Sequence, residues 1–116
     1  MPTDHEWPDA LDALIAAPEH HALLFENDCV RVIEARVPPG QTVPLHTHRW
    51  PAAQYVLSWS DFVRRDAAGE TQLDSRMAGM LAPGSAAWSA PLGPHTLENV
   101  GTAELRVIAV EQKMAK

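Results

Sequence analysis

The stretch PPGQTVPLHTHRWPAAQYVLSWS, residues 38–60, places two histidines one residue apart, His46 and His48, after a Pro-Pro-Gly turn and before an apolar run. In a β-strand successive side chains point to opposite faces, so residues two apart share a face. The two imidazoles are therefore predicted to converge on one side of a sheet, as metal ligands or a proton-transfer pair must. Which groups they meet there depends on how the rest of the chain folds.

The chain on both sides of this stretch is predicted to consist of short β-strands. Each apolar or alternating segment is followed by a Gly, Pro, Asn or Asp signal for a turn, a rhythm typical of an antiparallel sandwich or barrel. Ten prolines fit this pattern because proline is tolerated at strand ends and not in central strands. The predicted strands are CVRVIEARV (29–37), YVLSWSDFVRR (55–65), TQLDSRMAGML (71–81), SAAWSAP (85–91), HTLENV (95–100) and LRVIAVEQ (105–112).

A single short helix is predicted ahead of the strands. In DALDALIAA, residues 9–17, Leu11, Leu14 and Ile15 recur at helical spacing, and Pro18 stops the pattern. No repeat or linker separates further units. We therefore expect one all-β domain at residues 26–116, preceded by an N-terminal segment, residues 1–25, that carries the helix.

Composition and charge exclude several classes of function. The 116 residues carry a formal net charge of -6, and the only two lysines, Lys113 and Lys116, lie in the C-terminal tail. Binding of nucleic acid is not expected, because it needs clustered Lys and Arg. The single cysteine rules out an internal disulfide. Neither a signal-peptide pattern nor an apolar run long enough to span a membrane is present, so a cytoplasmic protein is expected.

The second half of the chain contributes a third histidine. In APGSAAWSAPLGPHTLENVG, residues 82–101, a Gly-Pro turn leads into His95, and Leu97 and Asn99 follow on the same strand face. The segment from Gly40 through His46, His48 and QYVLSWS resembles the first motif of the cupin family, and PGSAAWSAPLGPHTLEN resembles the second. The resemblance covers about residues 28–112.

The resemblance implies a fold and a ligand set. The fold is a double-stranded β-helix, the small jelly-roll barrel of the cupin (RmlC-like) proteins, with the two motifs facing each other inside it. The family's usual metal ligands carry over onto His46, His48 and His95. The family's glutamate ligand falls at Ala52 in this chain, where no metal can bind.

Gln54 is the possible fourth ligand. It lies two residues beyond Ala52 and hence on the same strand face. Carboxamides bind transition metals weakly, and a hydrogen bond to a barrel-lining group or to water is the alternative role for this side chain.

Three neutral imidazoles and no carboxylate predict one divalent transition metal, Fe, Ni, Zn, Cu or Mn, with positions open to a small-molecule ligand. Among cupins, such sites resemble those of three-His dioxygenases. The leading expectation is therefore a metal-dependent enzyme that oxidises a small molecule with dioxygen. A non-catalytic cupin that binds or senses a small molecule, and a metal-dependent isomerase or lyase, are the alternatives.

Other residues carry weaker expectations. Arg64 and Arg65 must point to opposite faces of a strand, and whichever points to the barrel mouth could pair with a substrate carboxylate, although solvated arginines are the commoner case. Trp50, next to the first motif, is the tryptophan most expected to line the pocket. His20 and His21 lie outside both motifs and are expected at the surface. A homodimer is expected, because a domain of this size buries little apolar area alone.

Overall fold

The computed structural model describes residues 7–113 of the chain. Its helical segments are the 3-10 turn η2 (Asp9–Leu11) and the one-turn helices α1 (Ala13–Ala16) and α2 (Ser75–Ala78). Its strands are β1 (His21–Glu26), β2 (Val30–Val37), β3 (Thr42–His48), β4 (Ala52–Ser58), β5 (Phe62–Asp66), β6 (Thr71–Asp74), β7 (Ala86–Ser89), β8 (Leu92–Asn99) and β9 (Leu105–Gln112). None of the helices described is long and apolar enough to cross a membrane.

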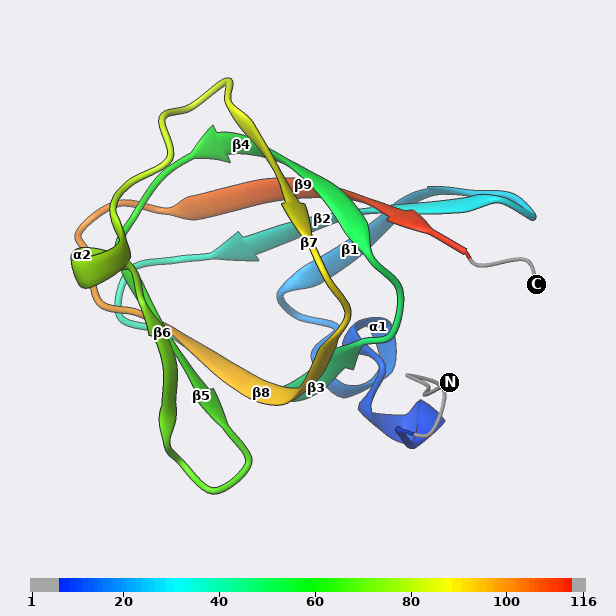
Figure 1. Cartoon of the computed structure of the whole chain (residues 1–116), viewed down its shortest axis with the longest axis horizontal. Helices are drawn as coiled ribbons and strands as arrows, with labels where there is room; N and C mark the ends of the chain where they lie inside the picture. The colour runs from blue at the N-terminus through cyan, green and yellow to red at the C-terminus, as the bar shows by residue number, and fades with distance from the viewer. Residues whose placement is uncertain (1–6, 114–116) are drawn as a thin grey trace.

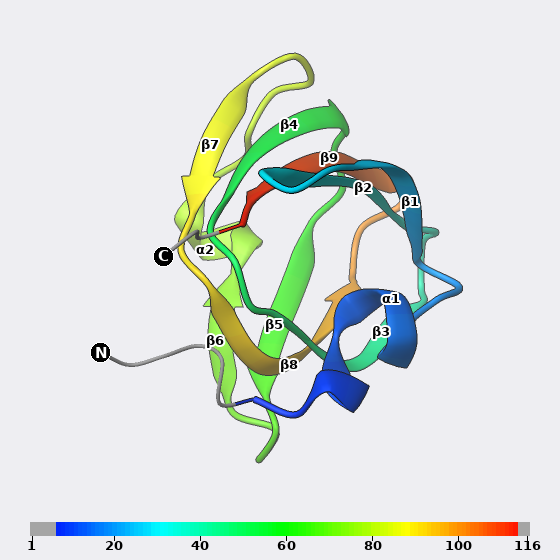
Figure 2. The same ribbon diagram turned by 90° about the vertical axis from the view of Figure 1, so that its right-hand side faces the viewer.

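The strands form two antiparallel sheets that face each other across a common interior (Figures 1 and 2). One sheet has the order β1-β2-β9-β4-β7, and the other has the order β3-β8-β5-β6. Helix α1 packs beside β3 and β1, whereas α2 packs on β5 and β6 at a different end of the barrel (Figure 1). The all-β prediction is confirmed. The chain therefore places strands from both of its halves around one interior.

The N-terminal helix is shorter than predicted. Asp12 interrupts the expected helix with an extended backbone (φ −53°, ψ 141°), and its side chain accepts a hydrogen bond from the backbone N–H of Leu14 at 3.1 Å. This capping arrangement starts a new helix and leaves a 3-10 turn before it. The boundary expected between residues 25 and 26 stays a prediction; β1, which was not expected as a strand, runs across it and pairs with β2.

Two predicted strands are broken for identifiable reasons. The segment 55–65 ends one strand at Ser58 and begins the next at Phe62, because the chain passes there from the five-stranded sheet to the four-stranded sheet. The segment 71–81 is a strand only as far as Asp74. The Asp74 side chain then accepts a hydrogen bond from the backbone N–H of Arg76 at 3.0 Å and starts α2.

The turn before β3 depends on Gly40. This residue has φ +81°, a conformation that glycine adopts without strain. Its N–H donates to the carbonyl of Asn99 at 3.1 Å, and the N–H of Asn99 donates to the carbonyl of Gln41 at 2.9 Å. These two hydrogen bonds join the turn to the end of β8. They thereby help to set the register of β3 and β8, the strands that carry His46 and His95.

Asn99 itself is a buried hydrogen-bond centre, with 1% of its surface exposed. Its amide nitrogen donates to the carbonyls of Val37 (2.8 Å) and Ala103 (2.9 Å), and its amide oxygen accepts from Ser60 Oγ (2.7 Å) and the N–H of Gly101 (2.9 Å). All four groups belong to turns or strand ends. The Asn99 side chain thus supplies hydrogen-bond partners to buried polar groups from several different turns and strand ends.

Replacement of this side chain should destabilise the barrel strongly. We expect Asn99→Ala to lower the free energy of unfolding by about 3 kcal/mol, because it leaves buried donors and acceptors without partners. Urea denaturation followed by circular dichroism measures this. Asn27→Ala is the matched control, since the Asn27 side chain also accepts backbone hydrogen bonds, but in an exposed turn. Equal losses in the two variants would contradict the assignment.

Candidate metal centre

Four histidines, and not three, meet inside the barrel. His46 and His48 lie on β3, His95 lies opposite His46 in the register of β3 with β8, and His21 begins β1. The His46 ring centroid lies 4.2 Å from that of His95 and 4.9 Å from those of His48 and His21. The nitrogen ligand atoms of His21, His46 and His48 lie within 4.8 Å of one another. The centroid of His95 lies 5.6 Å from that of His48.

Every imidazole of this cluster is held through its Nδ1 atom. The acceptors are Ala17 O for His21 (3.0 Å), Pro44 O for His46 (2.7 Å), Gly93 O for His95 (2.7 Å) and the Glu111 carboxylate for His48 (3.3 Å). Carbonyl oxygens only accept hydrogen bonds, so Nδ1 carries the proton and Nε2 keeps its lone pair. Within residues 7–113 no hydrogen bond engages any of the four Nε2 atoms. The cluster therefore offers four free nitrogen donors.

Burial keeps the imidazoles of His21, His46 and His95 neutral. It lowers the pKa of His46 from 6.5 to about 2, with further lowering from the neighbouring His48 and His95. Burial likewise lowers the pKa of His21 and that of His95 to about 4. Neutral imidazole is the form that binds metal, so at neutral pH these three rings need to lose no proton before they bind an ion.

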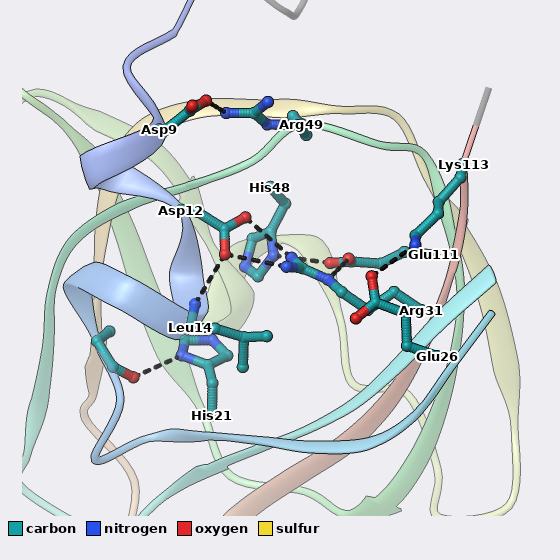
Figure 3. A network of polar contacts seen from close by, with 11 residues as sticks. Asp9, Asp12, Leu14, His21, Glu26, Arg31, His48, Arg49, Glu111 and Lys113 are labelled. Carbon is teal, nitrogen blue, oxygen red and sulfur yellow. Dashed lines mark hydrogen bonds and ion pairs between the residues drawn. The ribbon is translucent and has the colours of Figure 1, made fainter. Parts of the chain in front are cut away.

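His48 is oriented by a buried network of charges (Figure 3). The Arg31 guanidinium donates to Oε1 of Glu111 at 2.7 Å and to both oxygens of Asp12 at 2.9 and 3.0 Å. Glu111 has none of its surface exposed, and its other oxygen is the one that meets His48. A carboxylate behind an imidazole fixes the ring and raises its basicity as a metal ligand.

The tryptophans are placed differently from expectation. Trp50 does not line the cavity; its ring packs under the Arg31 guanidinium, whose Cζ lies 5.0 Å from the ring centroid. This contact is a cation–π interaction that covers the buried network. Trp59 lines the cavity, and Trp88 is 64% exposed. The prediction that Trp50 lines the pocket is therefore wrong, and Trp59 is the tryptophan that does so.

A cavity of about 350 Å³ opens in front of the four imidazoles. Its lining is mostly apolar and includes Trp59, Phe62, Leu97 and Val107. A pocket of this size with few polar groups is typical of small-molecule binding. Arg64 also lines it, whereas Arg65 points away and pairs with Glu98 at 2.9 Å.

The position of the absent glutamate is filled by apolar packing. Ala52 is buried against Ile33 and Ala109, with Leu14 beside them. Gln54 lines the same cavity as the histidines, and no hydrogen bond of its side chain is found within residues 7–113. Instead of a carboxylate from β4, the cluster receives the imidazole of His21 from β1.

His21 is the site residue that sequence reasoning missed. It and its neighbour His20 were expected at the surface, and both expectations are wrong, since each is only 8% exposed. His20 Nε2 donates to Gln41 Oε1 at 3.0 Å outside the cluster, while His21 turns inward. No spacing relates His21 to either motif. The only local signal is a histidine at the start of an apolar segment, HALLFE, that proved to be a strand.

The buried neutral imidazoles predict a pH-dependent stability of the metal-free protein. In the unfolded chain these histidines are protonated below about pH 6.5, whereas in the folded protein the pKa of His21 and that of His95 are about 4. Between these pH values the unfolded state binds more protons, so acid favours unfolding. We expect chelator-treated protein to lose roughly 1 kcal/mol per imidazole between pH 7.5 and 5.5. Urea denaturation at both pH values measures it. His95→Gln should reduce this loss, and an unchanged stability in the wild type would contradict the burial argument.

Comparison with known proteins supports the architecture. No protein-family model matches the sequence, and no curated protein matches it significantly. Among solved structures, a cupin domain from Bordetella pertussis is 19% identical, with a TM-score of 0.67 over 81% of this chain and 92% of that one. An RmlC-like cupin from Methanocaldococcus jannaschii is 14% identical (TM-score 0.54; 79% and 77% covered). The polyketide cyclase RemF from Streptomyces resistomycificus is 23% identical (TM-score 0.52; 79% and 63% covered). The chain therefore has the double-stranded β-helix fold of the cupin and RmlC-like proteins, as its two motifs predicted.

Proposed function

We propose that the protein is a metal-dependent enzyme acting on a small molecule, with one divalent transition metal held by His46, His48, His95 and His21. The observation that carries the proposal is the set of free imidazole nitrogens. Each ring is held at Nδ1, and within residues 7–113 no hydrogen bond engages any of the four Nε2 atoms. Ligand atoms of His21, His46 and His48 lie within 4.8 Å of one another, and the His95 ring centroid lies 4.2 Å from that of His46. Imidazole nitrogens suit Fe, Ni, Cu, Zn and Mn better than Mg or Ca, so the donor set fits an ion of this class.

In this proposal His21, and not Gln54, is the fourth metal ligand. The His21 ring lies 4.9 Å from that of His46 and 5.4 Å from that of His48, close enough for one ion to contact all three. An imidazole is also a stronger ligand for these metals than a carboxamide. Gln54 then serves as a polar group of the cavity wall, where it would contact the bound small molecule.

When bound, the ion supplies a Lewis acid with open positions for an oxygen or sulfur atom, and a redox centre if it is iron. The chain supplies the apolar cavity that excludes water and the four rings that fix the site. No Asp or Glu side chain lines the cavity in the part of the chain that the structure describes. A reaction that needs an Asp or Glu of the cavity wall to move a proton is therefore disfavoured. Oxidation by dioxygen is the reaction we propose first, and isomerase or lyase chemistry is the alternative.

A non-catalytic module that binds or senses a small molecule is the alternative of a different class. The mainly apolar cavity would serve it equally well. Oxygen uptake by iron-loaded protein separates the two, because a sensing module binds its ligand without turnover.

The expected homodimer and cytoplasmic location also stay predictions. The half-exposed side chains of Leu23, Leu24 and Phe25 on the edge strand β1 are an apolar surface that pairing would cover.

Metal content tests the proposed site. Protein purified without a histidine tag should carry close to one transition-metal ion per chain by elemental analysis, and the His46→Ala/His48→Ala variant should carry none. His21→Ala should weaken metal affinity by more than about tenfold, while His20→Ala, its matched neighbour, should not. Metal-free wild type that does not take up any of these ions would overturn the proposal. Equal affinities of the His21→Ala and His20→Ala variants would return the site to three ligands.

The buried carboxylate behind His48 gives a second test. Glu111→Gln keeps the shape of the side chain but removes the charge that both Arg31 and His48 face. We expect metal affinity to fall roughly 10–100-fold. We also expect a loss of about 3 kcal/mol in stability, since Arg31 is left with one carboxylate. The control is Glu98→Gln, which breaks a partly exposed pair with Arg65 and should change neither quantity appreciably.

A further inference from the structure

Arg64 stands on the inner face of the four-stranded sheet. It is paired with Leu97 on β8 and with Leu73 on β6, and all three residues line the cavity. Its neighbour Arg65 alternates to the outer face and pairs with Glu98. The strand therefore directs the half-buried Arg64 side chain toward the cavity wall and the Arg65 side chain away from it.

Among residues 7–113, no carboxylate forms an ion pair with the Arg64 guanidinium. Its Nε donates to Oε1 of Gln72 at 3.1 Å, and within residues 7–113 no acceptor meets its two terminal nitrogens. The chain's other arginines all pair with a carboxylate: Arg31, Arg36, Arg49, Arg65, Arg76 and Arg106. Burial lowers the pKa of Arg64, which reflects the cost of holding this cation away from water. An anionic ligand would offset that cost.

Arg64 is also the only permanently charged side chain among the residues described along the cavity wall. The remaining wall is apolar apart from the histidines, Gln54 and Ser75. A single guanidinium at the edge of a mainly apolar cavity wall matches a single negative charge on an apolar body. A phosphate with two charges would leave one of them without a partner, so a carboxylate is the better match.

The position of Arg64 relative to the histidine cluster sets how such a ligand would lie. Arg64 pairs with Leu97, and His95 is two residues before Leu97 on the same face of β8. Diagonal neighbours of this kind lie roughly 7–8 Å apart between Cα atoms. One small molecule can therefore reach both groups.

We propose that the cavity takes a small carboxylic acid with an apolar body, whose carboxylate is bound by the terminal nitrogens of Arg64 while its other end lies toward the four histidines. The binding of the carboxylate follows from Arg64 alone. Only the role of the other end rests on the proposed metal-dependent function.

Hexanoate and its neutral counterpart hexanamide are suitable probes. Isothermal titration calorimetry of chelator-treated wild-type protein should show saturable binding of hexanoate at least about tenfold tighter than that of hexanamide, since charge-assisted hydrogen bonds are the stronger ones. Arg64→Met should abolish this preference, and Arg64→Gln gives a second uncharged variant should the first fail to fold. Arg64→Lys should retain part of the preference. Arg65→Met, the matched control on the outer face, should retain all of it.

The outcomes separate this proposal from the metal site. A preference for hexanoate that survives in Arg64→Met or Arg64→Gln would overturn the role of Arg64, as would a wild type that binds no hexanoate. A preference that appears only with metal bound, and disappears in His46→Ala/His48→Ala, would assign the carboxylate to the ion and overturn the role of Arg64 while supporting the metal site. An Arg64-dependent preference in protein that takes up no metal would support the role of Arg64 and overturn the metal proposal.

Discussion

The arrangement of the site depends on one buried cation. Arg31 lies between Asp12 and Glu111 and ties the N-terminal segment to β2 and β9. Asp12 caps α1, and the carbonyl of Ala17, just after this helix, holds the ring of His21. Glu111 holds the ring of His48. Two of the four imidazoles are thus oriented from opposite sides of the same guanidinium, and an interior ion pair of this kind is costly to break because it leaves a buried charge alone.

The remaining two imidazoles are oriented by backbone. His46 and His95 are partners in the register of β3 and β8, and each ring meets a carbonyl two residues earlier in its own strand, that of Pro44 or Gly93. Their positions follow from local chain geometry and strand pairing. Alternation along a strand predicted that His46 and His48 share a face, and the resemblance of the two motifs to those of cupins implied that His95 faces them.

The parts that sequence reasoning missed all depend on contacts between distant segments. Nothing local distinguishes Glu111 from an ordinary charged residue near a strand end; its burial comes from Arg31, 80 positions away in the chain. His21 was predicted at the surface, but it lies at the start of β1, which pairs with β2, and its side chain is buried. The breaks in the predicted strands likewise follow from the passage between sheets and from the cap at Asp74. The alternation of side chains along a strand predicts which residues share a face, but it does not predict which strand ends lie close together in the fold.

The absent glutamate has a consequence for charge inside the barrel. In this chain Ala52 packs into the apolar core, and the cluster gains a neutral imidazole from His21 where a carboxylate would have brought a negative charge. Glu111 is close by, but it forms an ion pair with Arg31 behind His48 and does not line the cavity.

The described cavity wall holds one cation, Arg64, and no anion, in a chain whose formal net charge is -6. A partly buried guanidinium without a carboxylate partner among the described residues is costly, and this cost is the basis of the proposed preference for a negatively charged ligand. A divalent ion at the four rings would add positive charge and strengthen that preference. An alanine at position 52 and an arginine at position 64 therefore both leave the described cavity wall without negative charge.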